Sequence, residues 1–145
     1  MVLEKPKPTR PAHIIALEKL AKLKEKKLWQ SDKVKQYHIE LSEVLREYLE
    51  NRYYVTALEQ TTYEILINMR SVQIENEPME KLKQLLTLSD LVKFAKEQPL
   101  ATENEMCMQH AYEVVEQTKM LSERIPEADE NISYSSAPIV IRYMI

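Results

Sequence analysis

The chain has 145 residues, of which 44% are hydrophobic and 30% are charged, and its formal net charge at pH 7 is -3. This length and composition allow one domain with a hydrophobic core and argue against wholesale disorder, and the small negative charge gives no general attraction to nucleic acid or anionic lipid. The sequence contains no glycine, which excludes the phosphate-cradling loops of Walker-type and Rossmann nucleotide sites and disfavours a sheet built on tight hairpins.

Two further features of the sequence bear on its setting. The single cysteine, Cys107, cannot form an internal disulfide, which fits a reducing compartment. The sequence has no apolar run of the ~18 residues needed to span a bilayer, and its start has no signal-peptide core. We therefore expect the chain as given to be soluble.

The first segment of the chain reads as a linker. Residues 4–11 place three prolines among basic residues, and prolines spaced in this way favour extended, solvated backbone over helix. We therefore predict an extended linker over residues 1–11 and a helical domain over residues 12–125. From Pro11 onward apolar residues recur at helical spacing as far as Leu28, which predicts a first helix.

A second helix is predicted after Ser31 and Asp32, which could cap it. One apolar stripe runs from Val34 to Leu49 at helical spacing and includes His38, and Asn51 is placed to stop the helix in the left-handed conformation. A row of glutamates occupies the opposite, polar face of this helix: Glu40, Glu43, Glu47 and Glu50.

The third helix is predicted from a capping box formed by Thr61 and Glu64. An earlier pair of the same form, Thr56 with Glu59, predicts a short extra turn around Ala57. We expect the segment from Asn76 to Pro78 to break the third helix, because a residue that precedes proline is biased out of helical geometry.

The rest of the chain predicts short helices, one long helix and a tail. A short helix begins at Met79, Ser89 or Asp90 caps a further helical piece, and Pro99 ends it. A capping box of Thr102 with Glu105 then opens a helix that is expected to reach Ile125, where Pro126 closes it.

Residues 126–145 are predicted to be a partly ordered or disordered tail. Its apolar end, Ile139–Ile145, could dock on the helices, pair as an edge strand or remain disordered. Together these elements predict an all-α protein, a single compact bundle of about five to six helices between an extended linker and an irregular tail.

A metal site is the first candidate for chemistry. Cys107 and His110 are three residues apart on one helical face, with Met106 and Met108 beside them, and such soft donors could bind a metal if His38 or His13 completed the set. Core packing explains Cys107 and a satisfied, half-buried histidine explains His38 without any metal. We therefore predict no metal site, no cofactor and no catalytic residue.

Three other patterns have structural and functional interpretations. The glutamate row resembles the carboxylate ladder of metal-binding bundles, but no Glu-x-x-His accompanies it, so a solvated face is predicted. The second helix, the turn and the third helix could form a helix-turn-helix, although the third helix offers only Arg70 as a cation. We expect Tyr53 and Tyr54 at the turn to wedge between helices rather than stack on bases.

The stretch from Leu28 to Lys119 resembles a known family. Its motifs are YHIELSEVLREYLENR from Tyr37 to Arg52, the pattern AxExTTxEI from Ala57 to Ile65, and DLVKFAK from Asp90 to Lys96. They are similar to the cytoplasmic carboxy-terminal region of bacterial BatD-like inner-membrane proteins, which are encoded beside the Bat aerotolerance proteins and a MoxR-type AAA+ ATPase. The motifs carry no catalytic role to transfer.

The resemblance implies a setting for the domain. In such proteins a transmembrane helix and a basic, proline-containing linker precede this region, which fits residues 4–11. The expected function is that of a non-enzymatic interaction or regulatory domain at the cytoplasmic face of the bacterial inner membrane, with a MoxR-type ATPase or a von Willebrand A-domain protein as partner. The alternative is a nucleic-acid-binding regulator that uses the helix-turn-helix.

Overall fold

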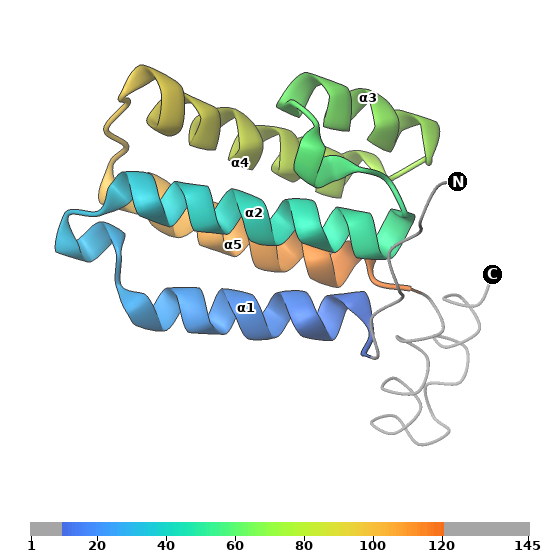
Figure 1. Cartoon of the computed structure of the whole chain (residues 1–145), viewed down its shortest axis with the longest axis horizontal. Helices are drawn as coiled ribbons and strands as arrows, with labels where there is room; N and C mark the ends of the chain where they lie inside the picture. Colours follow the sequence, from blue (N-terminus) through green and yellow to red (C-terminus); the bar gives the residue numbers. More distant parts are fainter. Residues whose placement is uncertain (1–9, 121–145) are drawn as a thin grey trace.

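The computed structural model describes residues 10–120 of the chain, which fold into five α-helices and two short 3-10 helices. Helices α2 (Val34–Tyr53) and α5 (Ala101–Thr118) lie side by side in the middle, with α1 (Ala12–Lys26) on one side and α4 (Asn76–Ala95) on the other (Figure 1). The short helix α3 (Thr62–Ser71) packs on α4. The predicted all-α fold is confirmed, and within residues 10–120 the structure contains no strand.

The connection from α1 to α2 differs from the prediction. Helix α1 ends where Lys27 adopts the left-handed conformation with φ 50°, and the 3-10 helix η1 (Trp29–Ser31) follows. The prediction that Ser31 or Asp32 caps α2 was wrong, because the residue before α2 is Lys33 and no side chain caps it. Asp32 is instead left-handed, with φ 65°. These two left-handed residues turn the chain without glycine.

Helix α2 also ends later than expected. Asn51 lies inside α2, and the left-handed residue is Tyr54 with φ 60°. The extra turn is held by a tertiary contact, because Arg52 Nε donates to the carbonyl of Thr118 at 2.7 Å. The Arg52 guanidinium also lies 4.5 Å from the centre of the neighbouring Tyr53 ring. Tertiary contacts of this kind override a local stop signal.

The predicted start of α3 is confirmed. Thr61 Oγ1 accepts from the backbone N–H of Glu64 at 3.2 Å, and Glu64 Oε1 accepts from the backbone N–H of Thr61 at 2.9 Å, so both bonds of the capping box are present. The predicted turn around Ala57 is the 3-10 helix η2 (Ala57–Glu59), but Thr56 does not cap it through its side chain.

Helix α4 is one continuous helix, although the sequence predicted two short helical pieces in this region. The segment from Asn76 to Pro78, which was expected to break the third helix, forms the first turn of α4. Helix α3 ends at Ser71, and Pro78 lies in the first turn of α4. Proline fits there because the first backbone N–H groups of a helix have no acceptor within it. The predicted cap residues lie in the middle of α4 and make other bonds: Ser89 lies 3.1 Å from His38, and Asp90 accepts from Thr62 at 2.6 Å.

Helix α5 begins before the predicted cap. The residue before the helix is Leu100, and its backbone N–H donates to Glu103 Oε1 at 2.8 Å. Thr102 lies inside the helix, so the predicted capping box of Thr102 with Glu105 was wrong. Helix α5 ends at Thr118. Lys119 is extended, so the prediction that this helix continues to Ile125 was wrong. Most of the predicted linker over residues 1–11 and the tail over residues 126–145 lie outside the described residues.

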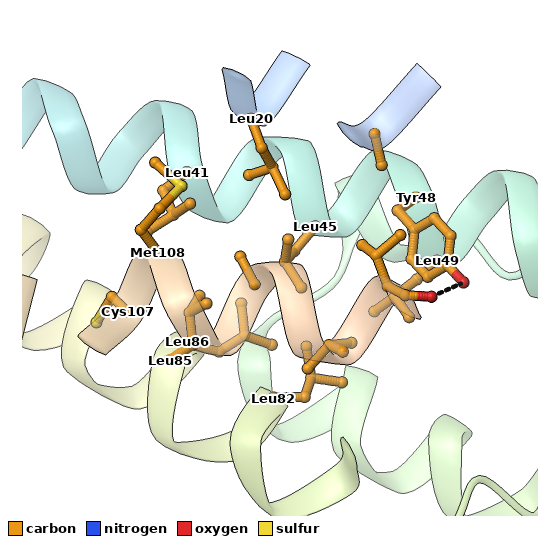
Figure 2. Packing of buried hydrophobic residues seen from close by; sticks show 14 of the residues in the cluster. Leu20, Leu41, Leu45, Tyr48, Leu49, Leu82, Leu85, Leu86, Cys107 and Met108 are labelled. Carbon is orange, nitrogen blue, oxygen red and sulfur yellow. Dashed lines mark hydrogen bonds between the residues drawn. The ribbon is translucent and has the colours of Figure 1, made fainter. Parts of the chain in front are cut away.

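The core fills the space between α1, α2, α4 and α5. Figure 2 shows leucines from α1, α2 and α4 meeting Cys107 and Met108 of α5, and these leucines are buried. Burial of apolar side chains in this interior is the main stabilising contribution to the fold. In the part of the chain that the structure describes, no helix is both long enough and apolar enough to cross a membrane.

Candidate functional site

A cleft of about 340 Å³ opens between the carboxyl-terminal end of α1 and the first half of α5. Leu23, Tyr37 and Met108 are buried in its lining, and Leu28, Trp29 and Tyr112 are half-buried. We call this concavity the α1–α5 cleft. Its further lining residues are Lys24, Lys27, Gln30, Glu105 and Gln109.

The turn between α1 and α2 builds one wall of the α1–α5 cleft. The left-handed Lys27 ends α1, and the backbone N–H of Lys33 donates to the carbonyl of Leu28 at 2.8 Å, which closes the turn. The closed turn holds Leu28 and Trp29 at the mouth of the cleft. On the inner side the Tyr37 hydroxyl donates to the carbonyl of Asn104 at 2.8 Å, which ties α2 to α5. Burial raises the pKa of Tyr37.

The charges on α1 divide into two rows with different surroundings. On the side that faces α2, Lys26 pairs with Glu40 at 2.7 Å and Lys19 pairs with Glu47 at 2.5 Å. On the side that faces the α1–α5 cleft, Lys24 and Lys27 are exposed, and no carboxylate of residues 10–120 forms an ion pair with either. The cleft is therefore bordered by two cations that the described chain leaves without a counter-charge.

A second concavity, the α1–α2 furrow, accounts for most of the predicted glutamate row. It has a volume of about 300 Å³ and is lined by Glu40, Glu43 and Glu47 together with Lys19, Lys22 and Lys26. Hydrogen bonds from Lys26 and Gln36 lower the pKa of Glu40. The prediction of a simply solvated row was wrong for Glu50, which is buried and accepts from the backbone N–H of Leu58 at 2.8 Å.

His38 belongs to a buried polar network. The prediction of a satisfied histidine is confirmed, but the ring is fully buried rather than half-buried, and its partners were not predicted. Its Nε2 lies 2.8 Å from Asn104 Oδ1, which can only accept, so Nε2 donates and Nδ1 accepts from the Ser89 hydroxyl at 3.1 Å. Burial lowers the pKa of His38, and the bond to Asn104 opposes this. A serine, a histidine and an amide in this order resemble the parts of a nucleophilic site, but His38 and Ser89 are fully buried. The network therefore joins α2, α4 and α5 internally.

Ser89 and Asn104 carried only weak signals in the sequence. Each interrupts an apolar stripe at a position that faces the core, and a small polar residue at such a position indicates a buried partner. Identifying that partner as His38 requires the packing of three helices, which the pattern of one helix does not contain.

The candidate metal residues have separate surroundings. Cys107 is buried and its pKa is raised to about 11 by burial, whereas His110 Nε2 lies 3.1 Å from Gln84 Oε1 of α4. His38 is occupied by Ser89 and Asn104, and His13 is buried in α1. Within residues 10–120 no three or more His, Cys, Asp or Glu side chains are grouped so that they could hold a metal ion.

The tyrosines at the end of α2 differ from each other. Tyr53 packs partly against the core, as expected, but Tyr54 is 71% exposed, so the prediction that both wedge between helices was wrong for Tyr54. Helix α3 shows Tyr63 and Ile67 to solvent, and Arg70 is also exposed. The helix-turn-helix interpretation of α2 and α3 stays a prediction.

Comparisons with family models, with curated proteins and with solved structures find no match for this chain. The resemblance to BatD-like proteins therefore remains a prediction from the motifs.

Proposed function

We propose that this chain is a non-enzymatic protein-interaction domain that receives a protein partner in the α1–α5 cleft. The observation that carries the proposal is the lining of that cleft, where Trp29 and Tyr112 stand half-buried above the buried Leu23 and Met108. Tryptophan, tyrosine and methionine are enriched at protein interfaces. The aromatic rings offer a large contact area at a small cost in conformational entropy.

The setting of the interaction follows the resemblance of the motifs. In this proposal the domain belongs to a membrane-anchored protein and works at the cytoplasmic face of the bacterial inner membrane. Its partner is a MoxR-type AAA+ ATPase or a von Willebrand A-domain protein of a Bat-type, stress-related system. The proline-containing basic segment at residues 4–11 supports the tether, since such a segment suits a spacer between a membrane and a folded domain.

A co-purification experiment tests this proposal. The purified chain is immobilised and offered the MoxR-type ATPase and the von Willebrand A-domain proteins of the same genome, each purified separately. We expect one of them to be retained by the unsubstituted chain and lost with Gln109→Phe, because Gln109 is exposed in the cleft and a phenyl ring at this position fills the space that the partner needs.

The matched control is Gln84→Phe. Gln84 is an exposed glutamine on α4 and, like Gln109, bonds to a glutamate four residues away along its own helix. Its Oε1 also lies 3.1 Å from His110 Nε2, so circular dichroism must show that this variant folds. Retention that survives Gln84→Phe but not Gln109→Phe supports the cleft as the binding site. Retention that both substitutions leave unchanged places the interface elsewhere and contradicts the proposal.

A further inference from the structure

We infer that the segment bound in the α1–α5 cleft is an acidic peptide with an aromatic or aliphatic anchor residue. This inference rests on the proposed function and adds the chemistry of the partner. It is carried by two observations together, the apolar lining of the cleft and the two lysines beside it that lack a counter-charge within residues 10–120.

The lysines of α1 provide an internal comparison. Three lysines line the α1–α2 furrow, where Glu47 and Glu40 pair with Lys19 and Lys26, while Lys22 has no ion pair within the described chain. Lys24 and Lys27 line the α1–α5 cleft, where the one carboxylate of the lining, Glu105, comes from α5 and pairs with neither of them within the described chain. A partner that brings carboxylates to Lys24 and Lys27 supplies the pairing that α2 supplies on the other side of α1.

The charge of the surrounding segment extends this local preference. The stretch from Lys22 to Lys35 contains six lysines and only Glu25 and Asp32 as acidic residues, in a chain whose overall net charge is -3. All six lysines are exposed, and four of them have no carboxylate partner on α2 and lie near the turn between α1 and α2: Lys24, Lys27, Lys33 and Lys35. Such a concentration of one sign attracts an acidic segment and raises its rate of association.

The shape of the site distinguishes a peptide from a membrane surface. A membrane-binding corner projects its apolar side chains outward into the lipid. Here Leu28 and Trp29 are only half-exposed and line a concavity, and Met108 is buried within it. A concave apolar lining beside two cations fits an inserted anchor side chain flanked by carboxylates.

The experiment selects peptides from a random displayed library on the full chain and measures the binding of the enriched peptides in synthetic form. Trp29 is the single tryptophan of the sequence and lines the cleft, so its fluorescence reports occupation of the cleft directly. We expect the enriched peptides to combine Asp or Glu with Leu, Ile or Phe and to change the Trp29 emission. The double variant K24E/K27E is expected to weaken their binding by about tenfold or more.

The matched control is K83E/K96E, which changes the net charge equally. Lys83 and Lys96 are exposed on or at the end of α4, and Lys96 is left-handed at a helix end as Lys27 is. Far-ultraviolet circular dichroism establishes that both variants fold. Equal weakening of peptide binding by the two double variants would show that net charge alone acts, and it would overturn the inference.

Three further outcomes separate the inference from the proposed function. Neutral or basic peptides that change Trp29 fluorescence would overturn the acidic partner while keeping the cleft as a docking site. Enriched peptides that leave Trp29 fluorescence unchanged and bind Gln109→Phe normally would overturn both. If the library yields no enriched peptide and vesicles of phosphatidylcholine with phosphatidylglycerol shift the Trp29 emission, the ligand is a membrane surface and the peptide inference is overturned.

Discussion

Two histidines of this protein, His38 and His110, differ in their burial and in their hydrogen-bond partners. His110 is half-buried beside Gln84, whereas His38 is fully buried between Ser89 and Asn104. The amide oxygen of Asn104 fixes the proton of His38 on Nε2, so the neutral ring satisfies both neighbours. A second proton on this ring would remove the acceptor that the Ser89 hydroxyl uses.

The buried His38 predicts a pH dependence of stability. Burial places the pKa of His38 in the folded protein below its ordinary value of 6.5. The unfolded chain therefore takes up more protons than the folded protein as the pH falls below that value, so the free energy of unfolding decreases in this range. We expect urea titrations from about pH 7.5 to about pH 5.5 to show this decrease, and we expect His38→Gln to reduce its slope.

The glutamates with lowered pKa values affect stability at a lower pH than His38 does. Hydrogen bonds keep the pKa of Glu40 and Glu113 below their ordinary value of 4.5, so the stability that these carboxylates contribute is lost only at more acidic pH. Parallel pH profiles for the unsubstituted chain and His38→Gln above about pH 5.5 would therefore contradict the role given to His38.

At the level of the helices, the sequence predicted their presence better than it predicted their ends. The apolar stripes of α2 and α5 correctly located the core-facing sides of these helices, because a 3.6-residue period is a property of one segment. For α1 the stripe was mostly wrong, since Ile14 is exposed and the helix faces the core with His13, Ala16, Leu20 and Leu23. The Thr61–Glu64 box was found correctly, but an identical spacing at Thr102 and Glu105 was a false signal. Helix α5 begins before Thr102, so this threonine is already inside the helix and cannot cap its start.

The same limit explains what could be predicted of the candidate site. Trp29, Tyr112 and Lys24 come from three segments, and no period within a segment indicates that they line one cleft. The lysine-rich end of α1 was visible in the sequence. Which of these lysines have a carboxylate partner, as Lys19 and Lys26 do, depends on which helices lie on each side of α1, and this is set by the packing.

Two threonines test the assignment of caps. Thr61→Ala removes the side chain that accepts from the backbone N–H of Glu64, and the loss of such a cap costs about 1 kcal/mol in the free energy of unfolding. Thr102→Ala, in the first turn of α5, is expected to leave stability unchanged or to increase it by a few tenths of a kcal/mol, because alanine is the better helix former. Urea titrations in which Thr102→Ala costs as much as Thr61→Ala would contradict the observed start of α5.

Because the sequence contains no glycine, left-handed positions are occupied by other residues, and introducing glycine at one of them is expected to increase stability. Five non-glycine residues of the described chain have positive φ, and Lys96 is one of them at the end of α4, with φ 58°. Glycine adopts this conformation without the steric cost of a β-carbon, so Lys96→Gly is expected to raise the free energy of unfolding by about 0.5–1 kcal/mol.

Lys83→Gly is the control for this effect in the same helix. Lys83 is exposed in the interior of α4, where glycine costs about 1 kcal/mol. The two substitutions change the same residue type but should shift the thermal midpoint in opposite directions. A decrease for both would show that the left-handed conformation of Lys96 carries no strain that glycine can relieve.

In the molecule as a whole, α2 and α5 hold the other helices in place. Tyr37 and Arg52 of α2 donate to carbonyls of Asn104 and Thr118 near the two ends of α5, and the Tyr48 hydroxyl lies 2.8 Å from the Thr118 hydroxyl. His38 extends the same connection to α4 through Ser89. These bonds hold α2 against α5, and α1 packs against both of these helices (Figure 1).

Whether a protein partner occupies the α1–α5 cleft can be decided by site-specific photo-cross-linking in the native cell. A benzophenone amino acid replaces Gln109 within the cleft in one strain and Gln84 on α4 in another. We expect irradiation to join one defined protein to the Gln109 position and not to the Gln84 position. Cross-linking of the same protein with equal yield at both positions, or at Gln84 alone, would contradict the cleft as the docking site.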